Sequence, residues 1–354
     1  MYIKKIKLTH FRNYDNQEIT LSPKINIFYG DNAQGKTNII ESIFLCSIGK
    51  SFRTSKEKEM IEFGKDFSNI EVEYEKMDRS GKIKIELQEK KNIFLNGIKL
   101  TKLSELLGNI HTVIFTPDDI NILKDGPQKR RRFLDMMIGQ LRPNYVYLLN
   151  RYNKTLEQRN NYLKQIKMES KSDELLSIWN EKLAEYGEKI YLYRKEFINK
   201  IIQKIKKIHK EITNNLEEIE IEYHSDCEDT NKFIEKLNQS QKIDILRGYT
   251  TKGIHRDDFS VYINQKLVNI YGSQGQNRTV ILSLKLSELQ VIYDEVGEYP
   301  ILLLDDFMSE LDEKRRSNFL EYTKNTQVII TCTDKILISE LENKIYKVKK
   351  GEIF

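Results

Sequence analysis

Gly30-Asp31-Asn32-Ala33-Gln34-Gly35-Lys36-Thr37 is the stretch of sequence that decides the fold of this chain. It fits the pattern G-x-x-x-x-G-K-[ST], a loop whose backbone N–H groups wrap nucleotide phosphates. Residues 24–28 before it predict a short strand, and residues from Asn38 onward predict a helix, which is the context that this loop requires. The sequence therefore predicts a nucleotide-binding α/β core, with residues 30–38 as the part that holds the triphosphate of ATP.

Length and composition limit the class of protein. A chain of 354 residues suggests two or three domains, or one large domain with an insertion. The formal net charge of +5 is a mild excess of base, which by itself argues only weakly for nucleic acid. The three cysteines lie far apart without a C-x-x-C, which argues against a disulfide framework or a zinc site and suits a reducing compartment. No apolar run approaches the ~18 residues of a membrane span, so we expect a cytoplasmic protein without membrane contact.

The pattern of apolar residues divides the chain into three parts. Residues 1–29 and 70–100 alternate with a period of two, as strands do. From residue 145 and again from residue 179, apolar positions recur in steps of three and four, with a break at Ser170–Asp173. This predicts two antiparallel helices, with an ordinary helical bundle as the alternative. After residue 240 the α/β character returns.

These patterns predict an α/β fold of mixed sheets, split by an inserted helical subdomain. We expect an N-terminal part of the head over residues 1–125, a helical insertion with the antiparallel pair over 126–240, and a C-terminal part of the head over 241–354.

The second half of the nucleotide site is predicted at Ile301-Leu302-Leu303-Leu304-Asp305-Asp306, an apolar run closed by two carboxylates. In open α/β sheets, ligands bind at the carboxyl ends of the strands, beside the phosphate loop. Asp305 and the Thr37 hydroxyl would then hold Mg²⁺, Lys36 would neutralise the outer phosphates, and Asp306 would orient the attacking water. Taken alone, such a run is also typical of a capped core strand, and the phosphate loop is what favours the site.

Two further motifs flank this strand. Ser273-Gln274-Gly275-Gln276 precedes it, and Ser309-Glu310-Leu311-Asp312 follows it. The order of phosphate loop, insertion, S-x-G-Q, acid-terminated strand and S-x-L-D turn resembles the ABC-type ATPases, in particular their SMC and RecF branch. This resemblance implies that Ser273, Gly275 and Gln276 cap the γ-phosphate of ATP bound by a second copy, so that ATP joins a homodimer. Taken alone, S-x-G-Q is also typical of a plain loop and helix cap.

Within this branch the chain resembles the RecF family over its whole length. The resemblance rests on four segments: Phe11-Arg12-Asn13-Tyr14, Ser51-Phe52-Arg53-Thr54, residues 126–135 (GPQKRRRFLD) and residues 253–258 (GIHRDD). Ile254 departs from the proline that the family tends to carry, and it leaves the role of His255 unassigned. From its place near the first strand, Arg12 is expected to reach the nucleotide phosphates, and Arg53 is expected to face ATP or DNA.

The RecF resemblance implies a function. It implies an ATP-dependent DNA-binding protein of recombinational repair and replication, which binds gaps or duplex–single-strand junctions and helps RecO and RecR to load RecA. Many ABC ATPases carry Glu where this chain has Asp306, and Asp is shorter by one methylene. We therefore expect slow hydrolysis, with ATP as a switch. Where many ABC proteins have a histidine after the next strand, this chain offers Thr331 or Thr333, and we expect one of them to sense the γ-phosphate instead.

A basic segment, Lys129-Arg130-Arg131-Arg132, opens an expected helix after Gly126-Pro127. Cations there oppose the helix dipole, so they need a compensating anion. Two sources remain open, namely protein carboxylates such as those of Asp118, Asp119 and Asp125, or nucleic-acid phosphate. Since no aromatic base-stacking platform stands out, we expect backbone contacts that weaken steeply with salt and vary little with DNA sequence.

Two other classes of function compete with this one. An ATPase whose main output is hydrolysis, such as a transporter head, is disfavoured because no partner-domain signature is present and a helical hairpin is inserted. An SMC-like tether is disfavoured because the helical pair is too short for long-range bridging. DNA-stimulated dimerisation that needs Mg²⁺ and ATP would separate the leading hypothesis from the first alternative.

Overall fold

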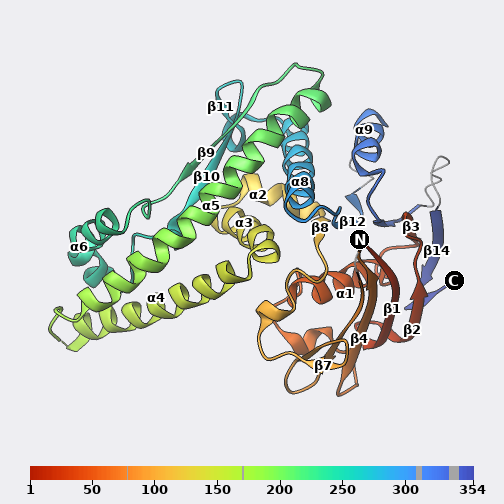
Figure 1. Ribbon diagram of the computed structural model, residues 1–354, viewed down its shortest axis with the longest axis horizontal. Helices are drawn as coiled ribbons and strands as arrows, with labels where there is room; N and C mark the ends of the chain where they lie inside the picture. The colour runs from red at the N-terminus through yellow and green to blue at the C-terminus, as the bar shows by residue number, and fades with distance from the viewer. Residues whose placement is uncertain (78, 170, 308–312, 335–342) are drawn as a thin grey trace. The chain divides into compact units, whose positions relative to one another are not determined.

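The computed structural model describes residues 1–77, 79–169, 171–307, 313–334 and 343–354 (Figure 1). The chain divides into two compact units, the first made of Met1–Asp119 and Leu282–Phe354 and the second of Ile120–Ile281. The predicted turn at residues 309–312 lies outside the described residues. Within the described part of the chain, no helix has both the length and the apolar character needed to cross a membrane.

The first unit contains an antiparallel sheet in the order β2-β1-β4-β5-β6-β7. Its strands are β1 (Tyr2–Phe11), β2 (Tyr14–Thr20), β4 (Ser68–Glu75), β5 (Ser80–Leu87), β6 (Asn92–Leu95) and β7 (Ile98–Lys99). Burial alternates strictly along β4, with Ile70 and Val72 turned inward, as the period of two predicts. One face of this sheet is therefore core and the other is solvated.

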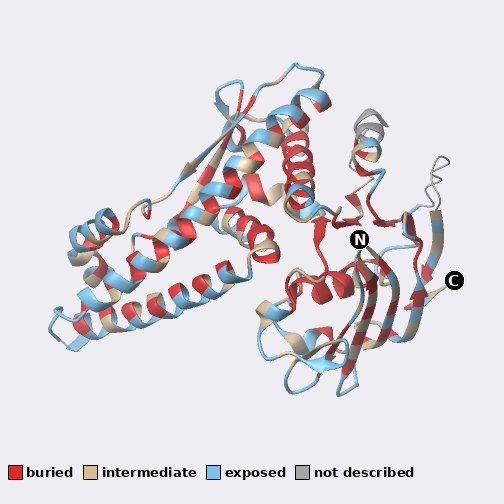
Figure 2. Ribbon diagram, viewed as in Figure 1, coloured by how far each residue is buried: buried red, intermediate tan, exposed pale blue. Residues whose placement is uncertain are grey.

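The second sheet of this unit is mixed, in the order β15-β14-β3-β13-β12-β8. Its strands are β3 (Ile25–Tyr29), β8 (Thr112–Phe115), β12 (Ile301–Asp305), β13 (Val328–Cys332), β14 (Asn343–Lys349) and β15 (Glu352–Ile353). All neighbouring pairs are parallel except β14 with β15. The central strands are buried along their whole length, as expected for parallel strands covered on both faces (Figure 2).

Helix α1 (Lys36–Ile48) contacts strands of both sheets, among them β4 and β12. This position explains why residues 39–48 are buried on every side, because a helix between two layers has no solvated stripe. The unit also holds α9 (Glu313–Thr323) and the 3₁₀ turns η1 (Glu57–Met60), η2 (Leu103–Glu105) and η3 (Pro117–Ile120), the last of which ends in the second unit.

The second unit is mainly helical. Its elements are α2 (Asn121–Lys124), α3 (Pro127–Leu141), α4 (Pro143–Glu169), α5 (Leu176–Thr213), β9 (Ile219–His224), α6 (Thr230–Arg247), η4 (Ile254–Arg256), β10 (Asp258–Ile263), β11 (Lys266–Leu267) and α7 (Val268–Tyr271). Helix α8 (Gln274–Val296) begins in this unit and ends in the first. The predicted antiparallel pair is α4 and α5, and α3 and α6 also pack on α5, so the pair belongs to a larger helical cluster.

The second unit is longer than the predicted insertion of residues 126–240, because it runs from Ile120 to Ile281. The cause is the three-stranded sheet β11-β10-β9. Strand β9 precedes residue 240, whereas its partner β10 follows it, and the two strands pair from Asp258 with His224 to Ile263 with Ile219. A pairing between distant segments leaves no mark in the local pattern from which the boundary was predicted.

Candidate functional site

The phosphate loop joins β3 to α1 as predicted, and Gly35 stands at its end as the residue before the first helical turn. Gly35 has a φ of 112°, and a Cβ there would lie 2.6 Å from the Asn13 side chain, so only glycine fits. Lys36 is almost fully buried, and its Nζ donates to the carbonyl oxygens of Gly30 (2.5 Å) and Asp31 (3.1 Å). The ammonium therefore lies across the loop, beside the first backbone N–H groups of α1, and a cation next to a helix N-terminus suits an anion.

The loop and the acid-terminated strand meet at one contact. The Thr37 hydroxyl donates to Asp305 Oδ1 at 2.8 Å, and the Thr331 hydroxyl donates to the same oxygen at 2.8 Å. Burial raises the pKa of Asp305, while the two hydroxyl hydrogen bonds act in the opposite direction. Thr37 and Asp305 thus offer two hard oxygen donors side by side in a partly buried place, which fits the ligand preference of Mg²⁺.

Asp306 follows directly and adopts a φ of 49°, which is uncommon for a residue other than glycine. Its N–H donates to Thr331 Oγ at 3.1 Å. Thr331 therefore donates to the Asp305 carboxylate and accepts from the Asp306 backbone, whereas the exposed Thr333 donates only to Asp334 among the described contacts. Of the two threonines proposed in place of the absent histidine, Thr331 is the one that contacts the end of this strand. The roles of Asp306 in catalysis and of Thr331 as a sensor stay predictions.

The turn between β1 and β2 packs directly on the phosphate loop. The Asn13 amide nitrogen donates to the Gln34 carbonyl (2.8 Å), and its carbonyl oxygen accepts from the Asn38 side chain (2.8 Å). The Tyr14 hydroxyl donates to the Gly35 carbonyl at 3.0 Å. Asn13 and Tyr14 entered the sequence reasoning only as part of a family motif, because no local pattern predicts that a β-turn lies against this loop.

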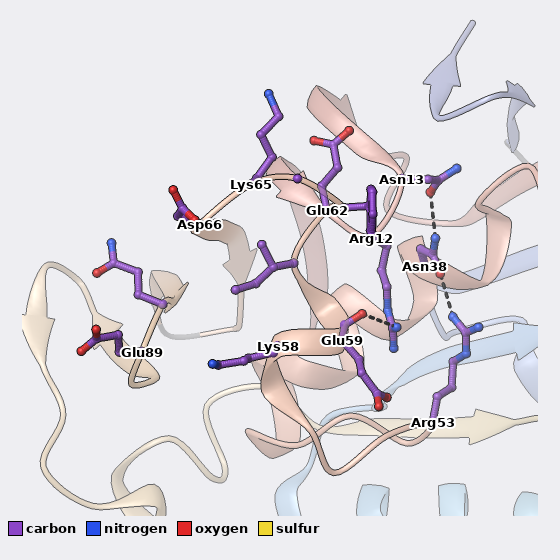
Figure 3. A pocket seen from close by; sticks show the side chains of 14 residues that line it. Arg12, Asn13, Asn38, Arg53, Lys58, Glu59, Glu62, Lys65, Asp66 and Glu89 are labelled. Carbon is purple, nitrogen blue, oxygen red and sulfur yellow. Dashed lines mark hydrogen bonds between the residues drawn. The ribbon is translucent and has the colours of Figure 1, made fainter.

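A pocket of about 870 Å³ opens beside this turn (Figure 3). Arg12, Asn38 and Arg53 form part of its wall, together with the exposed Phe63. It is also lined by Asn13, Lys58, Glu59, Ile61, Glu62, Gly64, Lys65, Asp66, Gln88 and Glu89. A mixed polar and apolar pocket next to the phosphate-binding loop has room for the remainder of a nucleotide.

Glu41 is a functional candidate that sequence reasoning missed. Its carboxylate is fully buried and accepts two hydrogen bonds from Arg12 (Nε 2.9 Å, Nη2 2.6 Å) and one from Arg53 (3.3 Å). Arg53 also donates to Asn38 at 2.7 Å. The two predicted arginines therefore lie at the pocket wall, tied to one carboxylate, and their contact with phosphate stays a prediction. An acid inside the apolar run 39–48 was the available signal, because a buried charge needs a partner.

The predicted signature residues form a helix cap. Ser273 Oγ accepts from the Gln276 N–H (3.1 Å), and Gln276 Oε1 accepts from the Ser273 N–H (2.9 Å), which is a reciprocal capping box. Gly275 lies inside the same turn, and its carbonyl accepts from Thr279. Within one copy, the helix-cap reading of this motif is therefore correct. Ser273 is exposed at the start of a 23-residue helix, so its predicted role toward a second copy is left open.

The basic segment divides in two. Arg130 is buried and donates to the Asp258 carboxylate (2.5 and 3.0 Å) and to the carbonyls of Ile122 and Asp125. Its compensating anion is thus a protein carboxylate, although not one of the three predicted. Arg131 donates to the Asp257 carbonyl at 2.7 Å. Lys129 and Arg132 are exposed, so they are the members of the segment that solvent and ligands reach.

His255, left unassigned by the sequence, bridges two parts of the second unit. Its Nδ1 lies 3.0 Å from the Tyr152 hydroxyl, and its Nε2 lies 3.1 Å from the Thr250 carbonyl oxygen. Burial lowers the pKa of His255 to about 4. With this lowered pKa the imidazole is neutral and carries one proton. Because a carbonyl can only accept, that proton is on Nε2, and Nδ1 accepts from the Tyr152 hydroxyl. His255 therefore has a structural role in this unit.

The phosphate loop is hydrogen-bonded to an acid-terminated parallel strand, and both belong to a mixed sheet whose chain carries a helical insertion. This combination defines an ATPase head of the ABC type, as found in SMC and RecF proteins. A family model described as the RecF/RecN/SMC N terminal domain matches residues 2–353. The chain belongs to the RecF family of DNA replication and repair proteins. The predicted fold class and family are thus confirmed.

Three comparisons give the extent of the likeness. The chain is 44% identical over 362 residues to the DNA replication and repair protein RecF of Clostridium perfringens, covering 100% of this chain and 99% of that protein. It is similar to a solved structure of the recombination mediator protein RecF-ATP in the RecFOR pathway, with 40% identity, a TM-score of 0.92, and coverage of 100% and 97%. The chain shares its fold with an Smc head domain from Pyrococcus furiosus. The two are 16% identical with a TM-score of 0.58, and the match covers 99% of this chain and 95% of that one.

Proposed function

We propose that this chain is an ATP-dependent DNA-binding protein of recombinational repair and replication, in which ATP joins two copies of the chain. The observation that carries the proposal is the 2.8 Å hydrogen bond between Thr37 and Asp305. It brings the phosphate loop and the acid-terminated strand into one site, as a nucleoside triphosphate with a divalent cation requires. The RecF-ATP structure at 40% identity over the full chain supports ATP as the nucleotide.

The chain's own residues would bind ATP through the loop 30–38. The backbone N–H groups at the start of α1 would face the phosphates, and the Lys36 ammonium would exchange the carbonyls of Gly30 and Asp31 for phosphate oxygens. Thr37 and Asp305 would hold Mg²⁺, which supplies neutralising positive charge to the phosphates when bound. Asp306, next along the chain, would orient the attacking water through its carboxylate.

The second copy would complete the site. Ser273, Gly275 and Gln276 lie at the N-terminus of α8, where the hydroxyl and the helix dipole favour an anion. Ser273 is exposed in one copy, so the motif is accessible to the γ-phosphate held by another copy. In this arrangement ATP bound by one chain lies between two chains, and pairing depends on the triphosphate.

DNA would bind through its phosphate backbone. The chain carries a net charge of +5, and Lys129 and Arg132 are exposed on α3. Contacts of this kind read no bases, which suits a protein that recognises a gap or a duplex–single-strand junction by its shape. By family resemblance, and in line with the RecFOR pathway named for the related structure, RecR and RecO are the proposed partners and RecA loading the proposed outcome.

ATP hydrolysis would be slow and would act as a switch. Asp306 is shorter by one methylene than the glutamate found in many ABC ATPases, so water is held less well. A steady-state turnover with DNA above roughly 10 s⁻¹, a median enzyme rate, would instead favour an enzyme whose main output is hydrolysis.

Sedimentation velocity tests the pairing. The wild-type chain should dimerise with ATP and Mg²⁺, and more so with gapped DNA, whereas Lys36→Ala and Ser273→Arg should stay monomeric. Asn231→Arg is the matched control, because it adds the same charge at an exposed position near the start of α6. If Ser273→Arg pairs as well as Asn231→Arg does, the trans role of the signature motif is wrong.

A further inference from the structure

The last hairpin of the chain touches the phosphate loop. Strands β14 and β15 are joined by Lys350 and Gly351, whose φ angles of 49° and 78° form a two-residue turn of type I′. The Lys350 N–H donates to the Gln34 side-chain oxygen at 2.6 Å, and the Gly351 N–H donates to the Gln34 carbonyl at 3.2 Å. Both donors are backbone groups, so this contact depends on the path of the turn.

The same carbonyl also accepts a hydrogen bond from the first turn of the chain. Asn13, in the turn between β1 and β2, donates its side-chain N–H to the Gln34 carbonyl at 2.8 Å. The next carbonyl, that of Gly35, accepts from the Tyr14 hydroxyl at 3.0 Å. Two consecutive carbonyls of the phosphate loop are therefore fixed by turns outside the loop.

Fixing these carbonyls also fixes the neighbouring N–H groups. In a planar trans peptide, the C=O and the following N–H point in opposite directions. With the carbonyls of Gln34 and Gly35 drawn toward the two turns, the N–H groups of Gly35 and Lys36 face away from them. These are N–H groups at the start of α1, where the proposed site binds phosphate.

We propose that the Lys350–Gly351 turn positions the phosphate loop, by holding the Gln34 peptide so that the Gly35 N–H is aimed at the nucleotide phosphates. The inference rests on the proposed function, that residues 30–38 bind ATP. It assigns to the C-terminal hairpin, which lies outside the phosphate loop in the sequence, a part in nucleotide affinity.

The steric fit at Gly351 makes the proposal testable. A Cβ on Gly351 would lie 2.0 Å from the Asn13 carbonyl oxygen, and real Cβ contacts essentially never fall below 3.0 Å, so the two turns must separate by about 1 Å. Gly97 occupies the same position of the predicted hairpin turn between β6 and β7, with a φ of 83°, and its Cβ would meet nothing within 4 Å. Alanine at Gly97 thus carries the same backbone strain without the collision.

The experiment compares the wild type and two variants, with a fluorescent ATP analogue titrated into each in the presence of Mg²⁺. Gly351→Ala should bind the analogue about tenfold more weakly than Gly97→Ala, because displacements near 1 Å are costly in a preorganised site. Thermal unfolding without nucleotide confirms that each variant is folded at the assay temperature.

A second variant covers the case in which Gly351→Ala does not fold. Gln34→Met keeps a similar side-chain volume and removes the oxygen that accepts the Lys350 N–H, so it should weaken binding by about threefold. Binding by Gly351→Ala within twofold of Gly97→Ala, or by Gln34→Met at the wild-type level, would overturn the positioning role. Failure of the wild type itself to bind would overturn the proposed function instead.

Discussion

The imidazole of His255 makes the stability of the second unit depend on pH. Its Nε2 donates to the Thr250 carbonyl and its Nδ1 accepts from Tyr152, so the folded unit needs the neutral ring. The pKa of His255 falls from the ordinary 6.5 to about 4 in the folded chain. Because the folded-state pKa is lowered, the unfolded chain binds the proton first. The stability contribution is fully present above pH 6.5 and is lost as the pH falls toward 4.

The size of the effect follows from the two pKa values. A shift from 6.5 to about 4 corresponds to about 3 kcal/mol when titration is complete, of which about 2 kcal/mol is lost between pH 7.5 and pH 5. Substitution His255→Gln keeps a polar side chain but removes the titrating group. Between pH 7.5 and pH 5, the free energy of unfolding should therefore fall by about 2 kcal/mol more in the wild type than in His255→Gln.

Urea unfolding followed by tryptophan fluorescence measures this difference, because the single tryptophan, Trp179, lies in α5 of the second unit. Curves at pH 7.5, 6.0 and 5.0 are compared for the wild type, His255→Gln and, as a control for loss of an exposed imidazole in the same unit, His224→Gln. Equal pH dependence in the wild type and His255→Gln would refute the assignment of a neutral, partly buried His255.

Three other predictions concern the nucleotide and DNA sites. Thr37→Val should weaken ATP binding at least about tenfold with Mg²⁺ and much less in EDTA, because it removes one oxygen donor to the metal while keeping the side-chain volume. Equal losses of affinity in the two titrations would contradict the metal role of Thr37. Replacing both Lys129 and Arg132 by Ala should reduce the magnitude of the slope of log DNA affinity against log salt concentration by about 1.8, because two phosphate contacts are lost. Arg130→Ala should leave that slope unchanged and lower the free energy of unfolding by about 2–3 kcal/mol, because Arg130 bonds Asp258. Asp306→Glu should raise the steady-state ATPase rate and Asp306→Asn should lower it, and an unchanged rate in both would remove Asp306 from catalysis.

The sequence predicted the parts of the site that are local in the chain. The loop 30–37 follows β3 and precedes α1, and the run 301–305 is a fully buried strand, because short motifs and apolar runs carry these elements by themselves. The hydrogen bond from Thr37 to Asp305 was also within reach, since parallel strands end at one edge of a sheet.

Contacts between distant turns were not predictable. Gln34 accepts from Asn13 and Gly351, which lie at opposite ends of the chain, and these contacts depend on how two sheets pack around α1. Glu41 and Arg130 show the same limit. Each is a charge whose partner is fixed only by tertiary packing, so the sequence indicated the need for a partner without indicating which residue supplies it.

In the proposed dimer, each ATP lies between two chains, held by the phosphate loop of one copy and the Ser273 motif of the other. Lys36→Ala damages the first element and Ser273→Arg the second. A mixed pair therefore has one pocket in which both elements are damaged and one in which both are intact. This arrangement predicts complementation between two defective chains, because the intact pocket can still hold ATP.

Sedimentation velocity of the two variants, separately and as an equal mixture with ATP and Mg²⁺, measures this directly. Each variant alone should stay monomeric, and the mixture should form dimers, more weakly than the wild type because one pocket of two is functional. A mixture that stays monomeric under conditions in which the wild type pairs, or Ser273→Arg that pairs by itself, would contradict the proposed dimer.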